Sequence, residues 1–191
     1  RLEQLGISPE SGEVLVTGAS GGVGSGSIML LAGLGYTVAA STGRLEESDY
    51  LKSLGANSVI DRRELSEAGE MMQAPRWAAA VDSCGSHTLA NVIAQLHYNG
   101  AVAACGLAQG LDLPGNMMPF ALRNVALLGV DSVHAPMALR ERAWQRLAES
   151  VDLNKLEAMA VEIDFDNLPE AAGQILQGQI RGRAVVNIAA R

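Results

Sequence analysis

The sequence predicts a doubly wound α/β fold, in which helices cover both faces of a parallel six-stranded sheet. Two observations predict it. Short apolar runs alternate with helical patterns along residues 1–134, and the first run breaks into a cluster of glycines that a helical pattern follows at once. Continuous apolar strands that alternate with helices are typical of a parallel sheet buried on both faces, with right-handed crossover connections.

The expected elements follow one another in order. We expect strands at residues 14–17, 37–41, 58–60, 78–82, 101–105 and 126–130. A helix from the glycine cluster to Leu34 follows the first strand, and a helix over 46–54 follows the second. Gly35 and Gly55 come directly after these two helices, where glycine commonly ends a helix. A helix from Thr88 to Leu96 follows the fourth strand, and a short apolar segment at 120–122 precedes the sixth.

After residue 134 the pattern changes. An amphipathic helix over 137–148 is followed by an apolar run at 161–165, a helix over 168–177 and a last strand at 184–188. The six-stranded sheet does not need these elements. We therefore divide the chain into a nucleotide-binding domain, residues 1–134, and a C-terminal segment, residues 135–191, that is expected to belong partly to another domain.

The composition excludes several classes of function. The chain has 191 residues, 48% of them hydrophobic, which is enough for one sizeable core. Its net charge is −7 and its basic residues are scattered, so neither nucleic acid nor an anionic membrane is an expected partner. Free thiols at Cys84 and Cys105, no signal peptide and no bilayer-spanning apolar run lead us to expect a soluble cytoplasmic protein.

The glycine cluster predicts a dinucleotide site. The segment reads Thr17-Gly-Ala-Ser-Gly-Gly-Val-Gly-Ser25, with glycines at Gly18, Gly21, Gly22 and Gly24. A strand, a glycine turn and a helix in this order let the backbone approach a pyrophosphate, which then faces the N–H groups and positive end of the helix. A tight turn without a ligand is the alternative. A P-loop is excluded, because Ser25 and Gly26 stand where that motif needs Lys and then Ser or Thr.

The end of the second strand indicates which dinucleotide binds. NAD-binding domains place an Asp or Glu about 20 residues after the glycines to bind the ribose hydroxyls. Here the strand ends in Ala39-Ala-Ser-Thr-Gly-Arg44, without an acid. Small hydroxyls at Ser41 and Thr42, then Gly43 and Arg44, form a site for a 2′-phosphate, because arginine presents a planar fork of donors to phosphate oxygens. We predict NADP(H), with a solvated loop arginine as the alternative for Arg44.

Three rival chemistries lack their residues. Short-chain dehydrogenases share the opening Thr17-Gly-Ala-Ser20, but their Tyr-x-x-x-Lys pair is missing, because no tyrosine of the chain has a lysine four residues later. Cys84 and His87 have a C-x-x-H spacing, yet a zinc site needs three or four protein ligands, so no metal site is predicted. Gly18-Ala-Ser-Gly-Gly22 resembles the G-x-S-x-G nucleophile elbow of α/β hydrolases, but its fifth residue opens the pyrophosphate turn and does not close an elbow, so no Ser-His-Asp hydrolase is predicted.

A series of further motifs follows the glycine turn and Gly43-Arg44. They are Tyr50-Leu-Lys-Ser-Leu-Gly-Ala56, Ala103-Ala-Cys-Gly-Leu-Ala108, Met118-Pro-Phe120, Leu122-Arg-Asn-Val125, Gly129-Val-Asp-Ser-Val133 and Gln179-Ile-Arg-Gly-Arg183. In this order they span nearly the whole chain. Together they resemble the medium-chain dehydrogenase/reductase superfamily in its quinone oxidoreductase-like branch, and within that branch the acrylyl-CoA reductase group of zinc-independent, NADPH-dependent enoyl reductases.

The resemblance implies a Rossmann fold and an NADPH-dependent oxidoreductase. The expected reaction is reduction of an activated C=C bond, in an acrylyl-CoA-like, enone or quinone substrate, by hydride transfer. The pyrophosphate would lie at Ser20, Gly21, Gly22 and Val23, the 2′-phosphate at Thr42, Gly43 and Arg44, the adenine near Arg62, and the nicotinamide end near Leu107, Ala121 and Ser132. Core packing is the alternative for Leu107 and Ala121, and a strand-end cap for Ser132. No residue stands out as a proton donor, so no catalytic residue is assigned.

The resemblance also implies what surrounds this chain. Family members carry an N-terminal GroES-like domain, and their substrate cleft lies between that domain and the nucleotide domain. This chain starts where that domain would end, and residues 161–188 look like the part that returns to it. We expect a fragment of the enzyme, with a catalytically silent NADP-binding module as the alternative. Family members pair through the sheet edge, so we expect a homodimer through residues 126–130, unless that strand is central.

Overall fold

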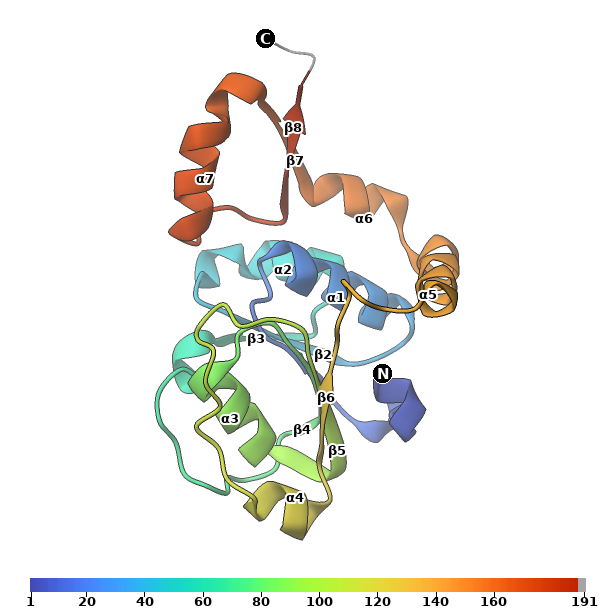
Figure 1. Cartoon of the computed structure of the whole chain (residues 1–191), viewed down its shortest axis with the longest axis vertical. Coiled ribbons are helices and arrows are strands. Elements are labelled where there is room, and N and C mark those ends of the chain that lie inside the picture. Colours follow the sequence, from blue (N-terminus) through green and yellow to red (C-terminus); the bar gives the residue numbers. More distant parts are fainter. Residues whose placement is uncertain (189–191) are drawn as a thin grey trace.

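The computed structural model describes residues 1–188 and has the predicted doubly wound fold (Figure 1). Among these residues, six strands form one parallel sheet in the order β3-β2-β1-β4-β5-β6. They are β1 (Val14–Val16), β2 (Val38–Thr42), β3 (Ser58–Asp61), β4 (Trp77–Asp82), β5 (Leu96–Ala104) and β6 (Ala126–Gly129). The strand order reverses between β1 and β4, and ligands of such folds bind in the crevice at this switch point.

Helices cover the two faces of the sheet, as Figure 1 shows. They are α1 (Gly22–Gly33) and α2 (Ser48–Leu54) on one face, and α3 (Ser86–Ala94) and α4 (Met118–Arg123) on the other. Alternation along β1 explains the two cores: Val14 and Val16 pack with α1 and α2, whereas Leu15 packs with α3. Short 3-10 helices cover Leu2–Leu5, Pro9–Ser11, Leu45–Glu47, Arg62–Glu64 and Phe165–Asn167.

The fifth strand is longer than the sequence predicts. It begins at Leu96, which we expected to end the preceding helix, and α3 already ends at Ala94. Leu96 is fully buried opposite Trp77, and the register between β4 and β5 then shifts. Asn99 has a φ of 61° and is followed by Gly100, so this pair has the character of a turn although it lies inside the strand.

The C-terminal segment forms a second, smaller layer. It contains α5 (Met137–Ser150), α6 (Leu153–Ala158), β7 (Ala160–Asp164), α7 (Leu168–Leu176) and β8 (Arg183–Asn187). β7 and β8 pair in parallel in a sheet separate from the large one, and α6 is a helix that the sequence did not predict. Met159, just after α6, is buried in the core formed with α1 and α2. Residues 189–191 of the predicted C-terminal segment lie outside the described residues.

None of the helices within residues 1–188 is both long enough and apolar enough to cross a membrane.

The central strand gives a direct test of this core. Leu15 is fully buried between β2 and β4, so Leu15→Ala should lower the free energy of unfolding by about 2–5 kcal/mol, through lost burial and a cavity. Urea denaturation measures the change. Leu111→Ala is the control, because that side chain is 86% exposed and its loss should cost about 0.5 kcal/mol or less. A loss below about 1 kcal/mol for Leu15→Ala would contradict the assigned packing.

Candidate functional site

The glycine turn, residues 17–21, is tied to the end of β4 by buried hydrogen bonds. The Thr17 hydroxyl donates to Asp82 Oδ1 over 2.7 Å and accepts from the Ser83 N–H over 3.1 Å. The N–H of Gly85 donates to Asp82 Oδ2 over 2.8 Å. Burial raises the pKa of the Asp82 carboxyl, and the bonds from Thr17, Gly85 and Cys84 oppose that rise. These bonds join the two strand ends on either side of the switch point.

Two glycines let the turn pack this closely. Gly18 has a φ of 59°, and a Cβ there would overlap the Ser83 hydroxyl. A Cβ on Gly24 would overlap the Gly18 carbonyl and Ala19, so α1 can approach the turn only with glycine at this position. The Ser25 hydroxyl then donates to the Ala19 carbonyl over 3.1 Å. The turn is therefore fixed against both its neighbouring strand and the helix that follows.

The N-terminus of α1 is an uncapped cluster of donors. The N–H groups of Gly22, Val23 and Gly24 precede the first helical hydrogen bond, from the Ser25 N–H to the Gly21 carbonyl, and the N-cap residue Gly21 has no side chain to accept from them. The Arg183 guanidinium lies over Gly22, with Nε 2.5 Å from where a Gly22 Cβ would stand. A cation beside the positive end of a helix is unfavourable unless an anion lies between them. This arrangement fits a phosphate group.

The end of β2 meets the glycine turn. Ser20 Oγ and Thr42 Oγ1 are 3.1 Å apart, and the Arg44 N–H donates to the same Thr42 oxygen over 3.1 Å. The Ala19 N–H donates to the Ser41 carbonyl over 3.1 Å. The structure thus brings together the residues that the sequence predicted for the pyrophosphate and the 2′-phosphate.

Arg62 joins this group from the end of β3. Its side chain crosses Gly43, with Nε 2.6 Å from where a Gly43 Cβ would stand. Arg44 and Arg62 therefore flank Gly43, one from each of two neighbouring strands. In a chain of net charge −7 this is a local gathering of positive charge.

The strand ends of β5 and β6 lie at the same edge of the sheet. Residues 104–107 and 129–131 line a shallow hollow of about 550 Å³ there. Leu107 is 60% exposed, and the N–H of the next residue, Ala108, donates to the Ser83 carbonyl over 3.2 Å. Ser132 follows β6, and its carbonyl accepts a hydrogen bond of 2.7 Å from Arg140. Leu107 is thus not a core residue, and both predicted residues border the switch-point side.

Ala121 lies apart from these residues. It belongs to α4, which directly precedes β6 and therefore lies at the opposite edge of the parallel sheet. Arg123, at the end of the same helix, donates to the carbonyl of Leu96 at the start of β5 over 3.2 Å. Ala121 is exposed, so core packing does not explain it either. The geometry gives no support to the prediction that Ala121 borders the nicotinamide.

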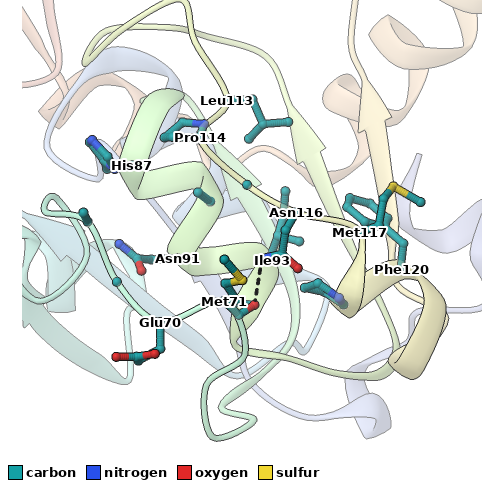
Figure 2. A pocket seen from close by; sticks show the side chains of 16 residues that line it. Glu70, Met71, His87, Asn91, Ile93, Leu113, Pro114, Asn116, Met117 and Phe120 are labelled. Atoms are coloured by element: carbon teal, nitrogen blue, oxygen red, sulfur yellow. Dashed lines mark hydrogen bonds between the residues drawn. The ribbon is translucent and has the colours of Figure 1, made fainter.

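A second cavity of about 460 Å³ lies beside α3 and is shown in Figure 2. It is lined mainly by apolar side chains of α3, α4 and the loops around Met71 and Leu113. Its amides are already bonded: Asn91 donates to the carbonyls of Leu65 and Glu67, and Asn116 to that of Met71. The cavity shares only α4 with the predicted cofactor residues, since Pro119 and Phe120 line it and Ala121 belongs to the same helix. It is therefore not the candidate site.

The His, Cys, Asp and Glu side chains of the described residues do not form a metal site. Within residues 1–188 no group of three or more His, Cys, Asp or Glu residues could hold a metal ion. Cys84 and Cys105 are free thiols, and burial raises the pKa of both. The thiol form is therefore favoured over the nucleophilic thiolate.

Sequence reasoning missed Arg183 and the contacts of its neighbours. The Arg44 guanidinium donates to the carbonyls of Gln179 and Ile180, over 2.9 Å and 3.2 Å. These partners are more than 130 residues away from Arg44 in the chain. The motif Arg181-Gly-Arg183 was the available signal, since a glycine between arginines before a strand marks a close backbone approach.

Known proteins match this chain along its length. The pattern of the zinc-binding dehydrogenases matches residues 22–149. Acrylyl-CoA reductase AcuI of Ruegeria pomeroyi is 48% identical over 188 residues, which are 98% of this chain and 57% of that protein. YhfP of Bacillus subtilis, called a putative quinone oxidoreductase, is 42% identical over 190 residues, or 98% of this chain and 58% of that protein.

Solved structures agree with the fold. The yhdH oxidoreductase of Salmonella enterica, crystallised with NADP, is 49% identical with a TM-score of 0.95, over 98% of this chain and 57% of that one. The yhfP structure, crystallised with NAD, has 42% identity and a TM-score of 0.92, over 98% and 58%. The chain thus spans less than two thirds of the length of the relatives it matches.

The buried carboxyl of Asp82 predicts a particular dependence of stability on pH. Because its folded pKa is raised above 3.8, the folded chain binds this proton more tightly, so the carboxyl's contribution to stability falls as pH rises above about 4. Asp82→Asn lacks this titration. Asp82→Asn should be less stable than wild type by a constant amount, because its hydrogen bonds are mismatched. Urea denaturation between pH 4 and 7 should also show that the free energy of unfolding of the variant rises relative to that of the wild type as pH increases.

Asp61→Asn is the matched control. Arg63 lowers the pKa of the Asp61 carboxyl below 3.8, so this group adds stability to the wild type only as pH rises toward about 4. Asp61→Asn should therefore differ from wild type by a nearly constant amount between pH 4 and 7. A pH-independent difference for Asp82→Asn, or one that grows less favourable to the variant as pH rises, would contradict the assigned environment of Asp82.

Proposed function

We propose that this chain, which belongs to the zinc-binding dehydrogenase family, binds NADP(H) and carries the cofactor site of a reductase for activated C=C bonds. One observation carries the proposal. The glycine turn and the arginine-bearing end of β2 meet directly, through the contact of 3.1 Å between Ser20 and Thr42. A pyrophosphate at the turn and a 2′-phosphate at Arg44 would then lie on adjoining donors.

The pyrophosphate would lie at the start of α1. Gly22 and Val23 provide backbone N–H groups with no partner in the helix, the Gly21 N–H donates to the Gly18 carbonyl over 3.0 Å, and the side chain nearest to Gly22 is that of Arg183. Arg183 would complete the site by facing the phosphates from the opposite side. The donor set consists of N–H groups and a guanidinium, which suits an anion.

The 2′-phosphate would lie between Arg44 and Arg62. Thr42 holds the Arg44 backbone, and Gly43 leaves the space that the Arg62 side chain crosses. The second strand ends without the acid that would bind ribose hydroxyls and repel a phosphate. The Salmonella structure contains NADP and the Bacillus structure contains NAD, so the preference of this chain rests on its own two arginines.

The nicotinamide would lie at the ends of β5 and β6. The shallow hollow beside Leu107 and Val130 provides an apolar floor there, and the backbone around Ser132 is fixed by Arg140. NADPH, when bound, supplies the hydride for reduction of the substrate. The residues of this chain bind NADPH and orient its nicotinamide. No residue is assigned as proton donor, and no step is assigned to a metal.

The substrate class follows from the relatives. Those at 48% and 42% identity are called an acrylyl-CoA reductase and a putative quinone oxidoreductase, so we propose an acrylyl-CoA-like thioester, an enone or a quinone as substrate. Reduction would need the cleft formed with an N-terminal domain of the GroES type, as in other family members. The second candidate is a catalytically silent NADP-binding module, which fits the chain's 57% coverage of the Ruegeria protein.

We also propose a homodimer that forms through β6, in the cytoplasm. β6 is one of the two edge strands of the described six-stranded sheet, so the alternative that it is a central strand is wrong. An exposed edge is commonly covered by pairing with another strand. The two free cysteines suit a reducing compartment.

Arg44→Ala should weaken NADPH binding selectively. Removing a charged hydrogen-bonding group costs about 1.5–3 kcal/mol, which corresponds to a roughly 10- to 100-fold higher Kd. The Kd for NADH, which lacks the 2′-phosphate, should change by about twofold or less. Fluorescence titration of both nucleotides measures the two constants.

Arg142→Ala is the matched control for this variant, because Arg142 is exposed on α5, away from the glycine turn. It should leave both constants unchanged. Equal affinity of the wild-type chain for NADPH and NADH would contradict the role given to Arg44.

The reaction itself is tested on the complete protein that contains this chain. We expect NADPH oxidation on addition of acrylyl-CoA, followed by the fall in absorbance of NADPH. Product analysis should show the saturated thioester. NADPH binding without turnover of any enoyl thioester, enone or quinone would favour the binding module instead.

A further inference from the structure

Residues Gln179–Arg183 form a strap that connects α7 to β8 and crosses the nucleotide-binding domain close to α2 (Figure 1). The Gly182 N–H donates to the Ser20 carbonyl over 3.0 Å, and Gly182 pairs with Gly21 in an isolated bridge. The C-terminal segment thus lies directly on the glycine turn.

Arg181 anchors the strap on the neighbouring helix. Its guanidinium lies 4.6 Å from the centre of the Tyr50 ring and pairs with Glu47 over 3.2 Å. The Tyr50 hydroxyl donates to Ser25, which in turn donates to the Ala19 carbonyl of the turn. The strap is therefore attached to the turn both directly and through α2.

The strap also holds Arg44. Its Gln179 and Ile180 carbonyls accept one hydrogen bond each, from Nη1 and Nη2 of Arg44 respectively. A guanidinium has five N–H donors, so three remain for a ligand. Two bonds from different nitrogens to one rigid segment fix the plane of the guanidinium, which is otherwise free to rotate at the end of a long side chain.

We propose that the strap is a specificity-determining element of the nucleotide site, which orients Arg44 so that its remaining donors are preset for a 2′-phosphate. This inference rests on the proposed NADP(H) site. Preorganisation of a donor raises affinity because less freedom is lost on binding. Coupling is reciprocal, so NADPH should hold the strap in place more strongly than NADH does. Gln179 and Ile180 act here through Arg44 and are positioning residues.

Gly182 is the residue on which this docking depends. Its φ is 61°, and a Cβ would overlap the Met159 carbonyl and come within 3.3 Å of the Tyr50 hydroxyl. Gly178, at the other end of the same connection, has a similar φ of 69°, but a Cβ there would meet nothing within 4 Å. A side chain at either glycine would strain the backbone, because both have a positive φ. Only a side chain at Gly182 would also overlap a neighbouring group.

The test compares Gly182→Ala with Gly178→Ala by fluorescence titration of NADPH and NADH. Gly182→Ala should displace the strap and reduce the ratio of NADH to NADPH Kd values about tenfold, mainly by weakening NADPH. Gly178→Ala should keep the wild-type ratio. Adding Gly182→Ala to Arg44→Ala should reduce the ratio no further, because both act on one interaction. An unchanged ratio in Gly182→Ala would overturn the inference.

Arg181→Ala provides a second route, which leaves the strap backbone and Gly182 intact and is used if Gly182→Ala fails to fold. It removes the contacts with Tyr50 and Glu47 and should lower the same ratio by a smaller factor. Arg181→Lys should keep part of the wild-type ratio that Arg181→Ala loses, since it keeps the charge that pairs with Glu47. An unchanged ratio of Kd values in Arg181→Ala, together with an intact fold by circular dichroism, would overturn the proposal that the strap sets the nucleotide preference.

Hydrogen exchange separates failure of the strap from failure of the proposed function. Exchange of the 179–183 backbone should be slowed by NADPH more than by NADH at saturating concentrations of each. Equal slowing by both nucleotides, in a chain that prefers NADPH, overturns the strap inference alone. A wild-type chain that binds neither nucleotide, or both equally, overturns the proposed 2′-phosphate site and the strap's role in it.

Discussion

The buried bond between the Thr17 hydroxyl and Asp82 holds the residue after β1 against the end of β4. The glycine turn can occupy this place only because Gly18 and Gly24 lack the Cβ atoms that would strike Ser83 and the turn's own backbone. Once the turn is fixed, its other contacts follow. The N–H groups at the start of α1, from Gly22, have no partner within the helix, and the Ser20 hydroxyl lies 3.1 Å from that of Thr42 on β2. Loss of the bond between Thr17 and Asp82 would displace the N–H groups at the start of α1 and the Ser20–Thr42 contact at the same time.

Charge is distributed unevenly around that anchor. The chain is acidic overall, with a net charge of −7, yet Arg44, Arg62, Arg181 and Arg183 gather around the glycine turn. Two of these arginines come from the first 134 residues and two from the C-terminal segment. The division of the chain at residue 134 remains a prediction, but the segment after it contributes contacts to the nucleotide site. A nucleotide-binding domain cut at that boundary would lose Arg183 and the partners of Arg44.

The sequence predicted the parts of this structure that depend on local pattern. The apolar run at Val14–Val16, the glycines after it and Arg44 at the end of β2 are separated by fixed numbers of residues, so their meeting follows from the order of a doubly wound sheet. The start of β5 was missed because Asn99-Gly100 has the composition of a turn while Leu96 pairs with Trp77. The strap was missed because contacts across more than 130 residues depend on tertiary packing, which spacing does not encode.

A crystal structure of the chain with NADPH bound is the decisive measurement for the proposed nucleotide site, because it locates both phosphate sites at once. We expect the pyrophosphate over Gly21–Val23, within reach of Arg183, and the 2′-phosphate bonded to Arg44, with Gln179 and Ile180 still holding that guanidinium. A 2′-phosphate that points to solvent away from Arg44 and Arg62, or a pyrophosphate placed away from the start of α1, would overturn the proposed site.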